Sequence, residues 1–152
     1  MTKSSFLVLD EPVSALDVSV QAQVLNLLID LQRERDLTYL FISHDLSVVR
    51  NIASRVGVMY MGQFCEIADV SEIFARPRHH YTHALFEAVP KMARRSRPKV
   101  AVLGEAPNAA AIPSGCRFHP RCPAAQHKCT IEKPVLRTLS KSHQVACHYP
   151  ID

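Results

Sequence analysis

The chain has 152 residues, of which 47% are hydrophobic and 21% are charged, and its formal net charge is +4. This balance is typical of one ordinary folded domain with at most one appended segment, and it excludes a disordered chain. The apolar runs are far shorter than the roughly 20 residues that span a bilayer, and the first residues lack a signal-peptide pattern. We therefore expect neither a transmembrane nor a secreted protein.

The first part of the chain alternates between strand and helix patterns. Continuous apolar runs predict strands over 6–9 and 38–42, each buried on both faces. Apolar residues at helical spacing predict a helix over about 18–35, with Asp17 at its start, and a further helix opens near Asp45.

The pattern then changes to a pair of strands, over 55–60 and 63–67, joined by a predicted hairpin turn at Met61-Gly62. A further helix is predicted over about 81–89. Strand, helix, strand, helix, strand is the order of a parallel sheet with crossover helices, so we expect an α/β fold.

The composition changes near Pro90. The residues before it carry an excess of acidic side chains, whereas those after it are basic and hold most of the prolines and four of the five cysteines. This joint change indicates two modules, 1–89 and 90–152. Because the basic module has only Phe118 and Tyr149 as aromatic residues, it lacks stacking platforms, and nucleic acid is not an expected partner.

Two acidic residues, Asp10 and Glu11, follow the first predicted strand. Parallel-sheet enzymes bind their ligands at the carboxyl ends of strands. At that place Asp10 is suited to hold Mg²⁺ opposite nucleotide phosphates, and Glu11 is suited to orient or deprotonate an attacking water. An acidic strand end without a catalytic role explains this pair equally well when the pair is taken alone.

The second predicted strand ends in Ser43-His44-Asp45. A neutral histidine at a strand end is suited to bind a γ-phosphate or the attacking water. A histidine that only caps a helix is the simpler alternative. His44 follows the next strand after the Asp-Glu pair, however, and this joint placement favours a shared site with Glu11.

These segments together resemble the ATP-binding subunits of ABC transporters. Residues 6–12 are similar to the Walker B segment, 14–17 to the D-loop and 43–45 to the switch-histidine loop. Residues 17–25 are similar to the subgroup that imports oligopeptides and dipeptides. Residues 114–123 and 145–150 resemble the carboxy-terminal extension of that subgroup.

The resemblance implies a partial P-loop NTPase sheet with crossover helices, followed by a Pro- and Cys-rich irregular extension. It implies ATP and Mg²⁺ as cofactors, with Asp10 on the magnesium side and Glu11 as the general base. It also implies His44 as the γ-phosphate sensor and Asp17 as a contact between two ATPase subunits.

The partners implied by the resemblance are a second ATPase subunit, identical or different, and two membrane-spanning permease subunits. A substrate-binding protein is an indirect partner. The implied location is the cytoplasmic face of the cell membrane, or the cytoplasm for a truncated and unassembled chain.

The family's Walker A loop, glutamine loop and signature sequence precede Walker B, and no segment of this chain resembles them. The Walker A loop supplies most of the contacts that bind ATP. We therefore expect poor ATP hydrolysis by this chain alone. It is either the carboxy-terminal portion of an ATPase that energises peptide import, or an inactive truncated or regulatory metal-binding module derived from one.

In 79–82 a second histidine replaces the family's proline, which is expected to loosen the entry of the next helix.

Four cysteines of the extension follow the spacing C-x5-C-x6-C-x17-C: Cys116, Cys122, Cys129 and Cys147. Four thiolates suit Zn²⁺ or a four-iron four-sulfur cluster, and the spacing does not choose between them. The resemblance favours the iron–sulfur cluster, because some members of the subgroup carry one there; free thiols or adventitious disulfides are the third alternative. Three histidines are candidate substitute ligands or hydrogen-bond donors around such a site: His119, His143 and His148. Cys65 is expected to be a buried packing residue.

Overall fold

The computed structural model describes residues 4–88 and 111–152, and their contacts divide the chain into two compact units, Met1–Ala53 and Ser54–Asp152. The predicted boundary between the modules 1–89 and 90–152 lies outside the described residues and stays a prediction. None of the described helices combines the length and apolar character that crossing a membrane requires.

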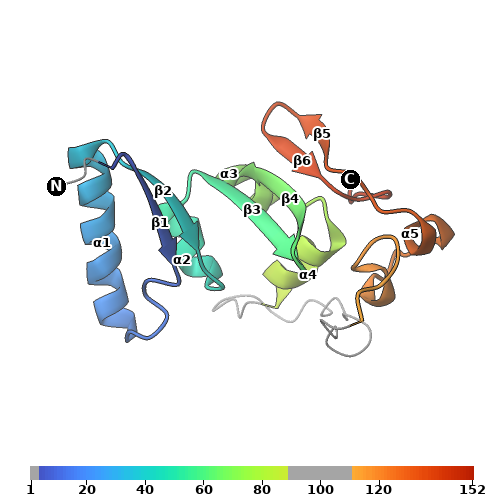
Figure 1. The fold of residues 1–152 in the computed structure, drawn as a ribbon, viewed down its shortest axis with the longest axis horizontal. Coiled ribbons are helices and arrows are strands. Elements are labelled where there is room, and N and C mark those ends of the chain that lie inside the picture. Colours follow the sequence, from blue (N-terminus) through green and yellow to red (C-terminus); the bar gives the residue numbers. More distant parts are fainter. Residues whose placement is uncertain (1–3, 89–110) are drawn as a thin grey trace. The chain divides into compact units, whose positions relative to one another are not determined.

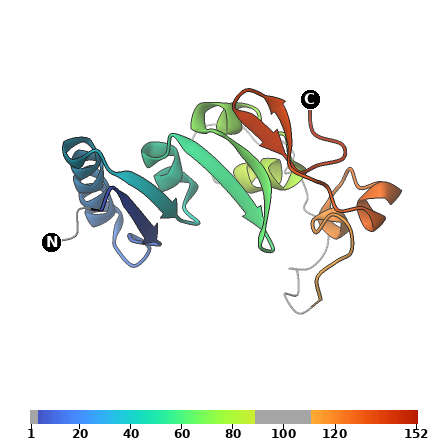
Figure 2. The same ribbon diagram turned by 45° about the horizontal axis from the view of Figure 1, so that its top comes forward.

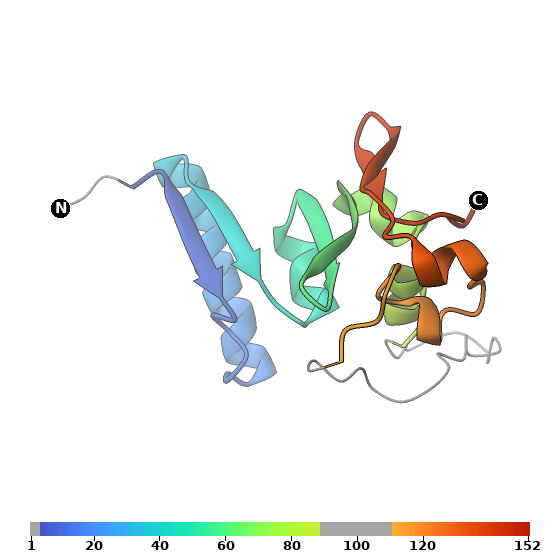
Figure 3. The same cartoon turned by 45° about the vertical axis from the view of Figure 1, so that its right-hand side comes forward.

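The first unit is a strand–helix–strand–helix arrangement. Its elements are β1 (Phe6–Asp10), α1 (Val18–Arg35), β2 (Thr38–Ile42) and α2 (Leu46–Ile52). Strands β1 and β2 pair in parallel, in register from Phe6 opposite Thr38 to Asp10 opposite Ile42. Helix α1 is the crossover and runs alongside both strands (Figures 1 and 3). The predicted parallel pair with its crossover helix is therefore confirmed.

Both helices of this unit begin at an aspartate. The Asp17 carboxylate accepts hydrogen bonds from the backbone N–H groups of Ser19 and Val20, at 3.0 and 2.9 Å. Asp45 does the same for α2, accepting from Ser47 at 2.8 Å. These N–H groups have no partner inside the helix, so a carboxylate at this position stabilises the first turn.

The expectation that 6–9 and 38–42 are buried on both faces is wrong for this structure. Phe6 and Val8 are 50% and 58% exposed, and Leu40 is 49% exposed. The reason is that β1 and β2 form a sheet of only two strands. The small core of the unit consists of Val13, Leu25 and Val48, with three partly buried neighbours: Val24, Phe41 and Ile52.

The second unit is built on an antiparallel sheet of four strands in the order β3-β4-β6-β5. Its strands are β3 (Arg55–Tyr60), β4 (Gln63–Asp69), β5 (Arg137–Ser140) and β6 (His143–Val145). Helices α3 (Val70–Ala75) and α4 (His80–Glu87) contact β4. A 3₁₀ helix (His119–Arg121) and α5 (His127–Ile131) precede the hairpin β5–β6 (Figure 2).

The hairpin predicted at Met61-Gly62 is confirmed, but β3 is not a third parallel strand. Met61 and Gly62 have φ angles of 47° and 75°, as a tight two-residue hairpin requires. This turn pairs β3 with β4 in antiparallel fashion, which places β3 in a different sheet from β1 and β2.

The extension is not irregular throughout, because its strand β6 pairs with β4 of the preceding segment. It also supplies a core residue, Phe118, which is 1% exposed and packs with Tyr60 and Cys65. The rings of Tyr60 and Phe118 meet edge to face with centroids 5.4 Å apart. Arg117 donates a hydrogen bond to the carbonyl of Met61, which ties the extension to the β3–β4 turn.

Candidate functional site

The structure brings Glu11 and His44 together at the ends of the two parallel strands. His44 Nδ1 lies 2.9 Å from Glu11 Oε1, and both side chains are exposed. The backbone N–H of Glu11 also donates to the carbonyl of Ile42, at 2.9 Å, which extends the strand pairing by one residue. A carboxylate and an imidazole in contact at a strand end form an acid–base pair that solvent reaches.

Glu11 has a left-handed backbone conformation, with φ of 46°. This conformation costs a non-glycine residue on the order of 1–2 kcal/mol, so neighbouring contacts must hold it. Ser14 supplies two of them, because its backbone N–H and its hydroxyl both donate to the Glu11 carbonyl, at 3.2 and 3.1 Å. Gln21 Nε2 holds the rest of the loop by donating to the carbonyls of Val13 and Leu16.

The other two carboxylates predicted for this site are also exposed on the first unit. Asp10 is the last residue of β1, and Asp17 caps α1. The hydrogen bond from the Val20 N–H is the main reason that the pKa of Asp17 lies below its ordinary value. The roles of Asp10 with magnesium and of Asp17 between subunits stay predictions.

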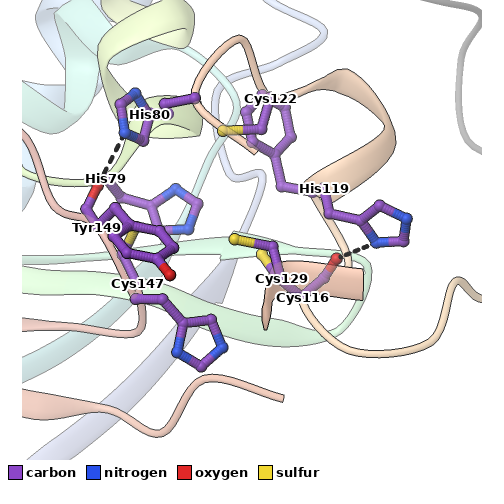
Figure 4. Close-up of a pocket in the computed structure, with 11 residues that line it drawn as sticks. His79, His80, Cys116, His119, Cys122, Cys129, Cys147 and Tyr149 are labelled. Atoms are coloured by element: carbon purple, nitrogen blue, oxygen red, sulfur yellow. Dashed lines mark hydrogen bonds between the residues drawn. The ribbon is translucent and has the colours of Figure 1, made fainter. Parts of the chain in front are cut away.

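The second unit holds a pocket around the cysteines of the extension (Figure 4). Eleven residues line it: the four cysteines Cys116, Cys122, Cys129 and Cys147; the four histidines His79, His80, His119 and His148; and Phe118, Ala124 and Tyr149. The four candidate ligands thus gather in one place from three segments of the extension: the turns around the 3₁₀ helix, α5, and the end of β6.

The backbone around Cys116 explains how two of these segments approach each other. The Cys116 N–H donates to the carbonyl of Cys129, at 2.8 Å. Gly115, with φ of 63°, comes so close that a Cβ atom there would lie 2.4 Å from the same carbonyl oxygen. Only glycine fits this close approach. Gly115 therefore sets the distance between the two cysteine-bearing segments.

Burial makes three thiols of the pocket weaker acids. It is the main reason that the pKa values of Cys116 and Cys122 are raised and that the pKa of Cys147 rises to about 11. The pKa of Cys65, in β4, rises to about 12, again mainly because of burial. A nearby metal cation would reverse this effect, because it stabilises thiolates.

Among residues 4–88 and 111–152, no group of three or more His, Cys, Asp or Glu side chains is placed to hold a metal ion. This finding supports neither the zinc nor the iron–sulfur alternative. The assignment of the four cysteines as ligands stays a prediction.

The histidines of the extension have different environments. His119 Nδ1 lies 3.0 Å from the Cys116 carbonyl, and His148 Nε2 lies 2.8 Å from the Glu132 carbonyl. Both line the pocket, whereas His143 is not among its lining residues. His143 instead contacts two glutamates, which the spacing of the sequence does not indicate.

His79 and His80 hold the entry of α4, so the loosening expected from the loss of a proline is not observed. His79 Nδ1 accepts a hydrogen bond from the Tyr81 N–H, at 3.0 Å, and caps the helix. His80 Nε2 lies 2.9 Å from the Tyr149 carbonyl, which is an acceptor for the ring N–H. In the sequence these two residues stand out only as a departure from a family pattern, and no sequence signal indicates that His79 lines the pocket.

Acidification is expected to destabilise the second unit through His79. Its burial lowers its pKa to about 4. An unfolded histidine takes up a proton near pH 6.5, so the folded state loses stability as the pH falls from about 6.5 to about 4. The His79→Asn variant keeps a capping oxygen but removes this titration. Between pH 7 and pH 4 the melting temperature of the original chain should fall more steeply than that of the variant. Equal slopes of melting temperature against pH would contradict the prediction.

The paired strand ends and the Glu11–His44 contact, on a mixed α/β fold, agree with the resemblance to ABC transporter ATP-binding proteins. Residues 65–129 match the family described as oligopeptide/dipeptide transporter, C-terminal region. This match, together with the relatives described next, confirms the resemblance to ATP-binding proteins of the oligopeptide/dipeptide subgroup.

Individual relatives agree with this assignment. The chain is 51% identical over 145 residues to the oligopeptide transport ATP-binding protein AppF of Bacillus subtilis, covering 93% of this chain and 44% of that protein. It is 48% identical over 150 residues to the di/tripeptide transport ATP-binding protein DppF of Pseudomonas aeruginosa, covering 98% and 46% of the two chains. The chain therefore spans less than half the length of these curated relatives.

Proposed function

We propose that this chain forms part of the ATP-hydrolysing subunit of an ABC importer of peptides. The observation that carries the proposal is the contact between Glu11 and His44 at the ends of neighbouring parallel strands. Relatives named as peptide transport ATP-binding proteins, similar over nearly the whole chain, support the choice of substrate class.

Each residue of the strand-end site has a distinct task in this proposal. Glu11 accepts the proton of the water that attacks the γ-phosphate, and His44 holds the γ-phosphate and orients the Glu11 carboxylate. Asp10 faces the magnesium ion that accompanies ATP, and that ion neutralises phosphate charge. The exposure of Glu11 and His44 in this structure leaves both side chains accessible to a nucleotide.

The same proposal assigns partners and a location. Asp17 contacts a second ATPase subunit, identical or different, when two subunits close around ATP. Closure acts on two membrane-spanning permease subunits, which receive peptides from a substrate-binding protein. The chain works at the cytoplasmic face of the membrane in this scheme.

For the module 90–152 we propose a four-iron four-sulfur cluster held by Cys116, Cys122, Cys129 and Cys147. The fit rests on the donor set, since four thiols line one pocket and burial raises the pKa of three of them, Cys116, Cys122 and Cys147. A cluster would add the cross-links that such a small segment, with Phe118 as its main buried apolar side chain, does not obtain from packing.

The 152-residue chain alone is expected to show no saturable Mg-ATP binding below millimolar concentration, which corresponds to a binding free energy weaker than about −4 kcal/mol. The physical reason is that no segment of it resembles a phosphate loop. Equilibrium dialysis or calorimetry measures this directly. A micromolar dissociation constant would reveal a phosphate site that the known motifs do not supply.

The alternative function is a catalytically inactive metal-binding or regulatory module derived from such an ATPase. The gathering of the four cysteines in one pocket is the observation that favours it. ATP turnover separates the two functions when this chain is compared with a chimera in which the amino-terminal portion of the Bacillus subtilis relative precedes it. An ATPase fragment gains turnover in the chimera, and an inactive module does not.

A further inference from the structure

The second unit contains a buried cluster of titratable groups outside both sites described above. Glu66 in β4 is 0% exposed and His143 in β6 is 2% exposed, although both side chains are polar. His143 Nε2 lies 2.6 Å from Glu66 Oε1, and His143 Nδ1 lies 3.1 Å from Glu72 Oε1 in α3. One imidazole thus stands between two carboxylates that come from different elements.

The two backbone partners of Glu66 favour its ionised form. Its Oε1 accepts from the Arg78 N–H at 2.6 Å, and its Oε2 accepts from the His79 N–H at 2.9 Å. The third partner, His143 Nε2, donates or accepts according to its tautomer. An ionised carboxylate only accepts hydrogen bonds, whereas a protonated one must donate one.

Two serine hydroxyls donate hydrogen bonds to Glu72. The hydroxyl of Ser140 lies 3.2 Å from Oε1, and that of Ser142 lies 2.5 Å from Oε2, in addition to the contact with His143. The hydrogen bond from Ser142 is the main reason that the pKa of Glu72 lies below its ordinary value. Glu72 is therefore ionised at neutral pH as well.

With both carboxylates ionised, only one protonation state of His143 gives each of them a donor. A neutral imidazole has one N–H group and one lone pair, and the lone pair would face a carboxylate oxygen. We propose that His143 carries a proton on both ring nitrogens and thereby acts as a proton-dependent clasp, which holds the carboxy-terminal hairpin β5–β6 against β4 and α3.

The clasp couples hairpin docking to proton uptake. The charged groups around His143 are Glu66 from β4 and Glu72 from α3; β5 and the turn after it contribute the hydroxyls of Ser140 and Ser142. If His143 loses one proton, one carboxylate faces a lone pair, and the two negative charges lose the positive charge between them. Because the docked form then binds one proton more than the released form, docking weakens as the pH rises. Cys147 lies two residues after the end of β6, so release also opens one wall of the cysteine pocket.

Nitrogen-15 NMR on the unmodified 152-residue chain tests the protonation state directly. At pH 7.5 the His143 ring is expected to show a proton on both nitrogens. A ring with one bare nitrogen would overturn the proposal. This measurement needs no variant, so it decides the question even if substitutions at Glu66 or His143 prevent folding.

Hydrogen exchange tests the coupling. The amide of Ala146, bonded to the Cys65 carbonyl at 2.8 Å, reports hairpin opening. After correction for intrinsic exchange, the opening constant is expected to rise with pH by up to about tenfold per unit above neutrality. In Glu72→Gln the amide can donate to an unprotonated ring nitrogen, so the hairpin should stay docked and the pH dependence should vanish. His127→Gln, which changes an exposed histidine of α5 outside the clasp, should keep the pH dependence. An unchanged pH dependence in Glu72→Gln would overturn the proposal.

Discussion

Replacement of Glu11 by glutamine is expected to lower ATP turnover by about 100-fold or more in the chimera that carries a phosphate loop, while ATP binding persists. Glutamine keeps the size and hydrogen-bonding reach of the side chain but removes the base that takes a proton from water. His44→Ala should lower turnover likewise, because the 2.9 Å contact that orients Glu11 is lost together with the γ-phosphate contact.

Two controls make this result specific. Glu34→Gln is the same chemical change on the exposed end of α1 and should leave turnover unaltered. Nucleotide affinity, measured separately by calorimetry, should stay within a few-fold of the unchanged chimera. If Glu11→Gln alters turnover by less than about twofold, Glu11 is not the general base.

The second large effect is expected in the cysteine pocket. Chain purified without oxygen should be brown, with about four equivalents each of iron and sulfide. Each serine replacement of a ligand cysteine should remove the colour and make the segment 114–131 sensitive to proteolysis. That segment depends on the cluster for cross-links, whereas β6 is also held by its pairing with β4.

Cys65→Ser is the matched control, because Cys65 is buried in β4 and packs against Tyr60 and Phe118. It should keep both colour and iron content. Colourless protein with one equivalent of zinc would replace the iron–sulfur proposal by the zinc alternative. Metal-free protein with an equally resistant segment 114–131 would reject both metals.

The elements of the first unit were predictable because their signals are local. Asp17 accepts from N–H groups two and three residues ahead, and apolar residues at helical spacing mark α1 up to Arg35. The Met61-Gly62 turn is likewise local, since its conformation and its residues are adjacent. Such interactions join near neighbours in the chain, so periodicity and turn residues reveal them.

Burial and strand partners were not predictable in the same way. The run at 6–9 is apolar enough for a covered strand, yet Phe6 and Val8 are exposed because the sheet around them has only two strands. Strand β3 follows the crossover pattern in the sequence, yet it belongs to an antiparallel sheet with β4 and the extension. The residue pattern of a strand does not specify which other strand will pair with it, or whether the pairing will be parallel or antiparallel.

The sequence by itself determined strands β1 to β4, helices α1, α2 and α4, the Asp10-Glu11 and His44 motifs and the subgroup resemblance, because each depends on residue types at short spacing. It did not indicate α3, α5, β5 or β6. Only the tertiary structure decided which distant groups meet. Glu66 and His143 are 77 positions apart and touch at 2.6 Å, and neither spacing nor composition indicates their contact. Chain folding brings such groups together, and burial then makes their charge and their hydrogen-bond partners interdependent.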